Sequence, residues 1–324
     1  MFVKNDANPF HLEDTYSQSR DDTSMTAIHI GISTCPNDTF AFHAIMNREI
    51  DLQGLEFDFE LLDVQELNER LLRGDFDVAK ASFNAALFLA DELGVLPAGS
   101  ALGFGVGPLL LAARPDHRPE THQTALPRHH DRYRVLCPGE HTTAHLLYRL
   151  FYNTGQVEHV VFSEIMPALK NQDADFGVCI HEGRFTFREE GLFCVEDLGT
   201  RWEKETGLPL PLGGILARHC LGHDLHQKLG NVIRSSIEHG MRNPELALPT
   251  MRRWAQEFSD QVLMSHVDLY VNDWTLELGV EGRQSLTRLA DLALQSGITT
   301  AHQPTLKVLS VSYTHLTLPT RLMV

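Results

Sequence analysis

The 324-residue sequence lacks several features that mark large protein classes. Its five cysteines are odd in number and include no CxxC pair, so we expect no disulfide framework and a reducing, cytoplasmic setting. No apolar run is long enough to cross a membrane. No G-x-G-x-x-G, P-loop or G-x-S-x-G motif is present, which argues against a nucleotide cofactor and against serine-hydrolase chemistry.

Positive charge is also scarce. The chain carries 27 Lys and Arg residues against 43 Asp and Glu residues, a net charge of −16. Nucleic acids and anionic membranes bind basic surfaces, so the sequence predicts neither as a partner. A small anionic ligand remains compatible with this charge, because a local cleft can be positive on an acidic protein.

The two ends of the chain differ from the rest. Residues 1–24 are polar and lack the apolar core of a signal peptide, and Met25 reads like a natural start. We therefore expect residues 1–24 to be a disordered or non-native extension. Residues 311–324 begin with VSYTHLTLPT, which reads like translated sequencing-adapter DNA. We expect this segment to be read-through after a truncation near Ser310, and we assign it no function.

Between these ends, short apolar runs alternate with helical patterns. The predicted strands are 28–32, 55–62, 76–79, 108–113, 133–137, 159–162, 175–180 and 213–217. The predicted helices are 38–46, 64–73 after an Asp63 cap, 83–93, 141–152, 163–170, 224–242, 244–257 and 281–296. This alternation predicts an α/β protein with mostly parallel sheets and helices on both faces.

A polar, histidine-rich segment at 115–132 predicts a surface loop or a crossover between domains, with His129 and His130 solvated rather than bound to a metal. The predicted first domain is discontinuous, with residues 25–114 and 213–310. The predicted second domain, 115–212, is inserted into it. Two crossings between domains make a hinge around a cleft, a common way to enclose a small ligand.

Polar side chains follow the first predicted strands, where open α/β sheets bind ligands. Ser33 and Asn37 lie in STCPNDTF, and capping of the next helix explains Asn37 and Asp38 equally well. Lys80 and Ser82 end VAKAS, although a parallel strand is normally apolar throughout. We favour Lys80 as the partner of a ligand carboxylate over a lysine that snorkels to the surface.

Two further segments of the second predicted domain carry candidates. Thr142 and Thr143 begin a helix after CPGE, so they belong either to an anion site or to a simple cap. His141 and His145 share a helix face, but the zincin pattern needs Glu at position 142, so no metal is expected there. His181, in FGVCIHEGRFTF, is the candidate general base.

The neighbours of His181 are weaker candidates. Glu182 is adjacent in a strand and should point to the opposite face, so it is a poor partner for the imidazole. Arg184 is expected to form a structural ion pair. Gly213 and Gly214 fit a tight crossover where one backbone approaches another or a ligand.

Several segments occur in the order of one family across roughly 28–294: STCPNDTF, ALGFGVGPLLLA, PGEHTTAHLL, EIMP, CIHEGRFTF, TGLPLPLGG and LYVN. The chain thus resembles the 1,4-dihydroxy-6-naphthoate synthases, which serve menaquinone biosynthesis by the futalosine pathway. The resemblance implies a type 2 periplasmic-binding-protein-like fold, with two α/β domains around a ligand cleft. It also implies a carbon–carbon lyase that converts cyclic dehypoxanthinylfutalosine to 1,4-dihydroxy-6-naphthoate without a metal or redox cofactor.

The same resemblance implies the site. His181 matches the family's catalytic histidine, and the substrate-contacting stretches match Lys80, Ala81, Ser82, Thr143 and Ala144. A base at His181 would take a proton so that the ribose-derived part leaves and the ring becomes aromatic. His145 and the long histidine-rich segment around His129 depart from the family pattern.

Two rivals stay open at the level of sequence. One is a solute-binding protein without catalysis on the same fold, and the other is the related chorismate-dehydrating enzyme of the same pathway. A cytoplasmic ligand sensor is a third and weaker alternative, without a DNA-binding signal in the sequence. The expected partner is a small-molecule carboxylate, and a homodimer contact through the late helices also stays open.

Overall fold

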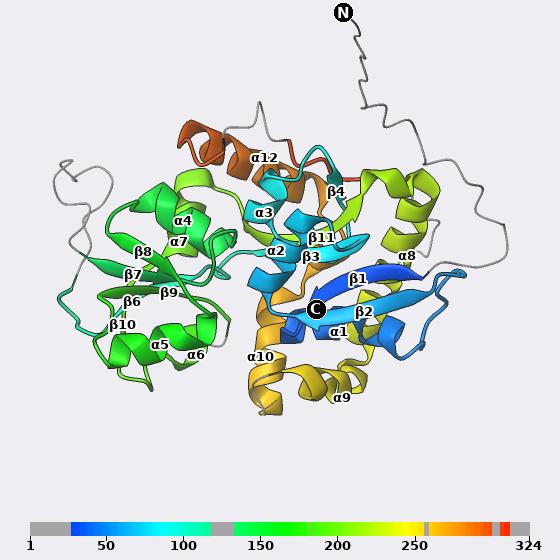
Figure 1. The fold of residues 1–324 in the computed structure, drawn as a ribbon. Helices are drawn as coiled ribbons and strands as arrows, with labels where there is room; N and C mark the ends of the chain where they lie inside the picture. Colours follow the sequence, from blue (N-terminus) through cyan, green and yellow to red (C-terminus); the bar gives the residue numbers. More distant parts are fainter. Residues whose placement is uncertain (1–26, 118–132, 182, 256–258, 300–304, 312–324) are drawn as a thin grey trace, which may run out of the picture.

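The computed structural model describes residues 27–117, 133–181, 183–255, 259–299 and 305–311. The described chain forms two lobes, each built around one β-sheet (Figure 1). The predicted extension 1–24, the His129–His130 pair, Glu182 and residues 312–324 lie outside the described residues. Among the helices of the described residues, none combines the length and apolar character needed to cross a membrane.

The first sheet has the strand order β2-β1-β3-β11-β4, with β5 also paired to β11. Its strands are β1 (Ile28–Ser33), β2 (Phe57–Leu62), β3 (Val78–Ser82), β4 (Leu93–Val95), β5 (Ala101–Gly103) and β11 (Leu210–Arg218). The helices of this lobe are α1 (Pro36–Met46), α2 (Val64–Arg73), α3 (Phe83–Leu87), α8 (His223–Arg242), α9 (Pro244–Trp254), α10 (Asp260–Tyr270), α11 (Asp273–Leu276) and α12 (Gly279–Gln295).

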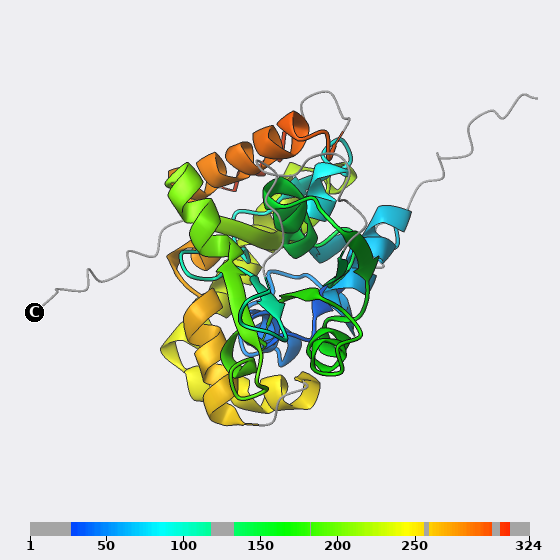
Figure 2. The same ribbon diagram turned by 90° about the vertical axis from the view of Figure 1, so that its left-hand side faces the viewer.

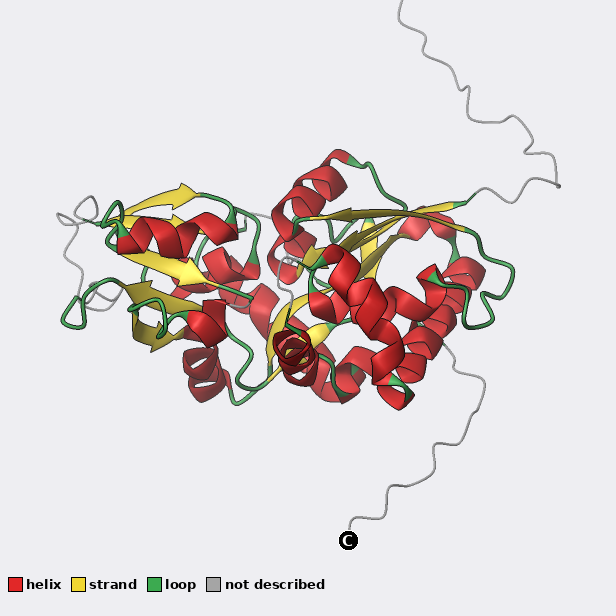
Figure 3. Cartoon of the chain, turned by 90° about the horizontal axis from the view of Figure 1, so that it is seen from below, coloured by secondary structure: helices red, strands yellow, loops and turns green. Residues whose placement is uncertain are grey.

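The second sheet has the strand order β10-β6-β9-β7-β8. Its strands are β6 (Leu109–Ala112), β7 (Arg134–Cys137), β8 (Gln156–His159), β9 (Phe176–Cys179) and β10 (Phe193–Asp197). Its helices are α4 (Thr143–Phe151), α5 (Phe162–Lys170), α6 (Gly183–Thr186) and α7 (Leu198–Thr206). The view from below separates the two sheets, each flanked by helices (Figure 3).

The sheets are mixed, whereas the sequence predicted mostly parallel ones. β1 runs parallel to β2 and β3, and β7 runs parallel to β8 and β9. β11 runs antiparallel to β3, β4 and β5, and β6 runs antiparallel to β9 and β10. The reversed strands are the ones by which the chain enters the second lobe (β6) and returns to the first (β11). The strand–helix alternation alone does not reveal these reversals.

Several element boundaries differ from the predicted ones. The predicted helix 83–93 ends at Leu87, and its last residue begins β4. The predicted strand 159–162 lies earlier, because α5 already begins at Phe162. α1 begins at Pro36, so Asn37 and Asp38 lie inside its first turn and do not cap it; Cys35 occupies the N-cap position.

Other local predictions are confirmed. Asp63 caps α2, with its carboxylate accepting a hydrogen bond from the Gln65 backbone N–H, and α2 has the predicted bounds. Gly213 lies where two backbones meet, since a Cβ atom there would come within 2.6 Å of the Ala81 carbonyl oxygen. The first sheet therefore brings β11 against β3 at the lobe boundary.

One apolar cluster runs through both lobes. It includes Phe83 and Leu216 from the first lobe together with Tyr148, Phe176 and Trp202 from the second. α12 packs against both β11 and α4, and it lies along the top of the molecule in Figure 1 and Figure 2. The two lobes thus share packed side chains on the side covered by α12.

Candidate functional site

A cavity that is partly open to solvent lies where the two lobes meet. The carboxyl ends of β1 and β3 reach it from the first lobe, and the segments after β7 and β9 reach it from the second. This is the edge at which open α/β sheets bind ligands. Its lining includes all the predicted site residues: Ser33, Asn37, Lys80, Ala81, Ser82, Thr143, Ala144 and His181.

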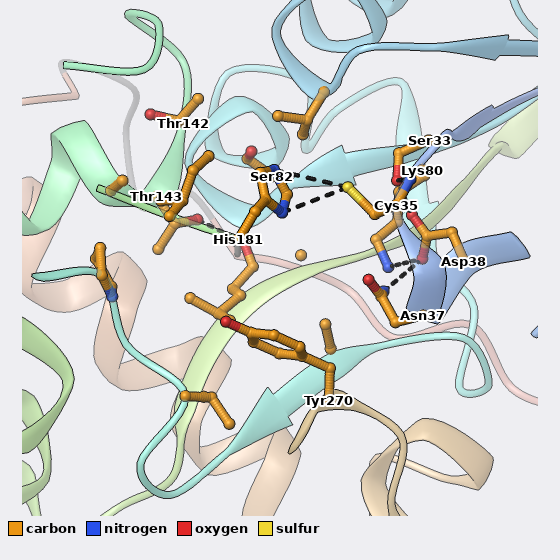
Figure 4. Close-up of a pocket in the computed structure, with 18 of the residues that line it drawn as sticks. Ser33, Cys35, Asn37, Asp38, Lys80, Ser82, Thr142, Thr143, His181 and Tyr270 are labelled. Carbon is orange, nitrogen blue, oxygen red and sulfur yellow. Dashed lines mark hydrogen bonds and ion pairs between the residues drawn. The ribbon is translucent and has the colours of Figure 1, made fainter. Parts of the chain in front are cut away.

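Asp38 organises the first-lobe wall of the cavity (Figure 4). Its buried carboxylate accepts hydrogen bonds from the Ser33 hydroxyl at 2.6 Å and the Asn37 amide at 2.9 Å. The Lys80 ammonium donates to the same carboxylate at 2.6 Å and lies 3.3 Å from the Gly99 carbonyl oxygen. Lys80 therefore has an internal counter-ion that the sequence did not identify, and the pair together brings little net charge to a ligand.

Ser82 is oriented by a buried amide. The Asn68 side chain accepts a hydrogen bond from the Ser82 backbone N–H at 2.9 Å and donates to the Ser82 hydroxyl oxygen at 3.1 Å. Since the hydroxyl oxygen accepts in this contact, its own O–H remains a donor that can turn toward the cavity. Asn68 is fully buried, so the orientation of Ser82 is well determined.

The N-terminus of α4 forms the opposite wall. Thr142 is the N-cap, and its hydroxyl accepts from the His145 backbone N–H at 3.2 Å and donates to the Gly139 carbonyl at 2.9 Å. Thr143 donates its hydroxyl to the Leu212 carbonyl at 2.6 Å, which ties α4 to β11. The first-turn N–H groups of Thr143 and Ala144 have no partner within the helix. Together with the helix dipole they favour an anion in the cavity.

His181 follows β9 in a left-handed backbone conformation, with φ of 55°. Such a conformation is uncommon outside glycine and often marks a functional site. The Cys35 sulfur lies 3.4 Å from Nδ1 and 3.6 Å from Nε2 of the imidazole (Figure 4). The Phe162 ring packs edge-on against the imidazole with a centroid distance of 4.8 Å. Contacts from both lobes therefore hold the ring at the cavity.

Two cavity residues on α10 were not predicted from the sequence. The ring of His266 lies 6.0 Å from that of His181 and 4.5 Å from that of Tyr270, centroid to centroid. Burial, and secondarily the neighbouring His181, lowers the pKa of His266 to about 3, so this ring is neutral at physiological pH. The buried residues Leu263, Val267 and Tyr270 have helical spacing, a signal that would have predicted α10.

The remaining sequence candidates have structural roles. Arg184 pairs with Asp197 at 2.7 Å and donates to the Gly107 carbonyl, as the predicted structural ion pair. His145 turns Nδ1 toward the Glu140 carbonyl oxygen at 2.8 Å, and burial lowers its pKa to about 4. His141 instead contacts the ring of Phe88.

A family described as menaquinone biosynthesis matches residues 28–295, which includes every residue of the cavity wall described above. The chain belongs to the menaquinone biosynthesis family. A 1,4-dihydroxy-6-naphthoate synthase from Thermus thermophilus is 40% identical over 82% of the chain and 93% of its own length. A protein of the same name from Streptomyces coelicolor is 35% identical over 87% of the chain and 98% of its own length.

Solved structures confirm the fold expected for this menaquinone biosynthesis protein. A crystal structure of an Archaeoglobus fulgidus protein matches with a TM-score of 0.77 at 27% identity, covering 84% of the chain and 98% of that protein. The periplasmic aliphatic sulphonate binding protein of Escherichia coli matches with a TM-score of 0.59 at 11% identity, covering 91% of the chain and 97% of that protein. The fold is therefore the two-lobed α/β fold of periplasmic binding proteins.

Proposed function

We propose that this chain is a carbon–carbon lyase that converts cyclic dehypoxanthinylfutalosine to 1,4-dihydroxy-6-naphthoate, with His181 as general base. The observation that carries the proposal is the position of His181. Its imidazole lies in the cavity between the lobes, on a strained backbone, in a chain whose curated relatives are named as this synthase. Backbone strain of this kind persists where the surrounding structure supports a functional geometry.

The substrate carboxylate is proposed to bind at the N-terminus of α4. The N–H groups of Thr143 and Ala144 and the dipole of α4 favour an anion there. Ser82, whose hydroxyl oxygen already accepts from Asn68, supplies an additional O–H donor from the first lobe. Because Asp38 neutralises Lys80, the lysine is assigned to shaping this wall together with Ser33 and Asn37 rather than to supplying the main positive charge.

The proposed chemistry needs one well-placed base. A ring nitrogen of His181 takes a proton from the bound substrate, the ribose-derived part leaves, and the remaining ring becomes aromatic. Aromatisation supplies driving force, so the protein mainly positions the base against the substrate. Cys35 contacts both imidazole nitrogens and restricts the ring, while neutral His266 adds no charge beside it.

The proposed setting follows from charge and cysteine chemistry. The odd number of cysteines, five, and the absence of a CxxC pair from the sequence support a reducing, cytoplasmic compartment. The net charge of −16 is compatible with a small-molecule substrate and argues against a nucleic-acid partner. The main alternative is a receptor that binds solutes without turnover. Its support is similarity of fold to a binding protein at 11% identity, and a shared fold does not show whether a chain catalyses a reaction.

The test is to incubate purified protein with cyclic dehypoxanthinylfutalosine and, separately, with chorismate, and to follow the products by mass spectrometry. The proposal expects 1,4-dihydroxy-6-naphthoate from the first incubation and no reaction in the second. Dehydration of chorismate would assign the chain to the related enzyme of the pathway. Binding of the first compound without turnover by folded protein would favour the receptor.

A further inference from the structure

A second group of titratable side chains lies at the other end of the helix that carries Asp38. It comprises His43 on α1, Glu49 just after α1, and His239 on α8. Oε2 of Glu49 lies 3.7 Å from Nε2 of His43 and 3.3 Å from Nε2 of His239. These three atoms all lie within 4.8 Å of one another. His43 is five residues beyond Asp38, about 7.5 Å further along the helix axis, so the group is separate from the cavity.

The hydrogen bonding of His43 determines which of its nitrogens carries a proton. Nδ1 lies 2.7 Å from the Phe40 carbonyl oxygen, which can only accept, so Nδ1 carries the hydrogen. With Nδ1 as the donor of the neutral ring, Nε2 presents a lone pair. Its side chain is 0% exposed and Nε2 has no hydrogen-bond partner. A carbonyl that fixes the tautomer in this way is the usual outer partner of a metal-binding histidine.

Nε2 of His239 is likewise buried without a hydrogen-bond partner. The two buried Nε2 atoms therefore converge on a carboxylate oxygen of Glu49, an exposed residue, although buried polar atoms normally find partners. A bound cation would give both nitrogens a partner, and the carboxylate would balance its charge.

The helices favour a cation at this point as well. His43 lies in the last turn of α1 and His239 in the last turn of α8, so the negative ends of two helix dipoles meet there. The absence of a side chain at Gly240 allows this contact, because a Cβ atom there would lie 2.9 Å from Cε1 of His43. The neighbouring guanidinium groups are paired elsewhere, Arg48 with Glu56 and Arg242 with Glu238.

We propose that His43, Glu49 and His239 form a binding site for a divalent metal ion of the zinc class, which clamps α1 to α8. Two imidazole nitrogens and one carboxylate oxygen are donors that zinc accepts, with bonds of about 2.0–2.2 Å. In a tetrahedral site such bonds place neighbouring ligand atoms about 3.3–3.5 Å apart. The two pairs that include Glu49 are 3.3 Å and 3.7 Å apart, and the two imidazole nitrogens lie within 4.8 Å of each other. Glu49 and His239 are 31% and 23% exposed, which gives the ion an entry path and leaves a fourth position for water.

The competing occupant is a proton. A protonated His239 would donate to Glu49 across the same 3.3 Å and leave no place for a metal. The two occupants differ in a measurable way, because a metal needs all three donors whereas the proton needs only two.

Zinc binding to tag-free, chelator-treated full chain tests the site, by titration calorimetry and by competition with a chromophoric chelator. Glu49→Gln and His239→Gln each remove one donor from a partly exposed position, so neither depends on repacking the core. His223→Gln makes the same change at an exposed position at the other end of α8 and serves as the control. Bound cobalt should give the visible absorption of a tetrahedral site in the unmodified protein and the control.

The proposal expects one zinc ion per chain in the unmodified protein and in His223→Gln, together with a rise in melting temperature on zinc addition. Glu49→Gln and His239→Gln should bind zinc at least about tenfold more weakly and lose that rise. Equal zinc uptake by all four proteins would show adventitious binding. No uptake by the unmodified protein would show that His239 and Glu49 share a proton instead of binding a metal. Either result would overturn the proposal. These readouts do not involve turnover, so they stand or fall independently of the lyase assignment.

Discussion

At the scale of single residues, His181 holds a backbone conformation that costs most side chains free energy. Its φ of 55° is one that glycine adopts without penalty, whereas an L residue with a Cβ atom loses about 1–2 kcal/mol. We expect His181→Gly to be more stable than His181→Ala by about 1 kcal/mol, measured by urea unfolding. Gln172, exposed and with φ of 61°, offers a matched Gly and Ala pair away from the cavity. If His181→Gly were less stable than His181→Ala, the backbone at position 181 would not be strained.

His266 gives the protein a specific sensitivity to acid. Its pKa is lowered from 6.5 to about 3 in the folded chain, mainly by burial. Between these values the unfolded chain binds a proton that the folded chain does not, so the free energy of unfolding falls as the pH falls from 6.5 toward 3. We expect His266→Asn to flatten this dependence by up to about 1.4 kcal/mol per pH unit, measured by urea unfolding from pH 7 to pH 4.

A partial slope should remain in His266→Asn, because burial also lowers the pKa of His43 and of His145. His223→Asn, an exposed histidine on α8, is the control and should keep the full slope. An unchanged slope in His266→Asn would show that this ring takes up its proton in the folded chain.

The sequence indicated most of the polar residues of the cavity but few of their partners. Ser33, Lys80, Ser82 and His181 stand out because each interrupts or ends an apolar run. Their partners do not stand out, because the contact between Cys35 and His181 joins residues far apart in the chain. The grouping of His43 with His239 is hidden for the same reason.

At the scale of elements, the N-terminus of α4 lies at the cavity and is capped by one residue, Thr142. Thr142 accepts from the His145 backbone N–H and fixes where the helix begins, next to the N–H groups assigned to the substrate carboxylate. We expect Thr142→Ala to lower the free energy of unfolding by about 1 kcal/mol and to raise KM more than it lowers kcat. Thr142→Ser retains the hydroxyl and should restore both. An unchanged KM in Thr142→Ala would show that the N-terminus of α4 does not bind the substrate.

Local capping signals also explain which elements could be predicted. The start of α2 was predicted from Asp63, which acts within the first turn of the helix, and the structure adds a left-handed Gly74 at its end. β4 and β5 have three residues each. Short strands are stabilised by their pairing with β11, which no local pattern reports.

At the scale of the whole molecule, the two lobes share an apolar cluster and a covering helix. The sequence predicted a hinge between an inserted domain, 115–212, and the rest. β6 precedes that boundary yet pairs within the second sheet, so the chain enters the second lobe earlier. Residues as distant as Phe83, Tyr148 and Trp202 pack in one cluster, which couples the lobes on the side of α12.

This shared cluster predicts cooperative unfolding. We expect residues 25–311 to unfold in one thermal transition, with the calorimetric enthalpy equal to the van't Hoff enthalpy, because separating the lobes would expose the apolar cluster to which both contribute. Differential scanning calorimetry measures both enthalpies. Two resolved transitions would mean that the lobes are stable separately and that the cluster contributes little.

The most direct test of the account is turnover of cyclic dehypoxanthinylfutalosine by His181→Asn, measured beside the unmodified protein and the exposed control His223→Asn. Asparagine keeps a polar side chain and tolerates the left-handed backbone, but it cannot act as a base near neutral pH. The account predicts that kcat falls at least about 100-fold in His181→Asn while the affinity for the substrate, measured by calorimetry, changes little. Turnover by His181→Asn at the rate of the control would contradict it.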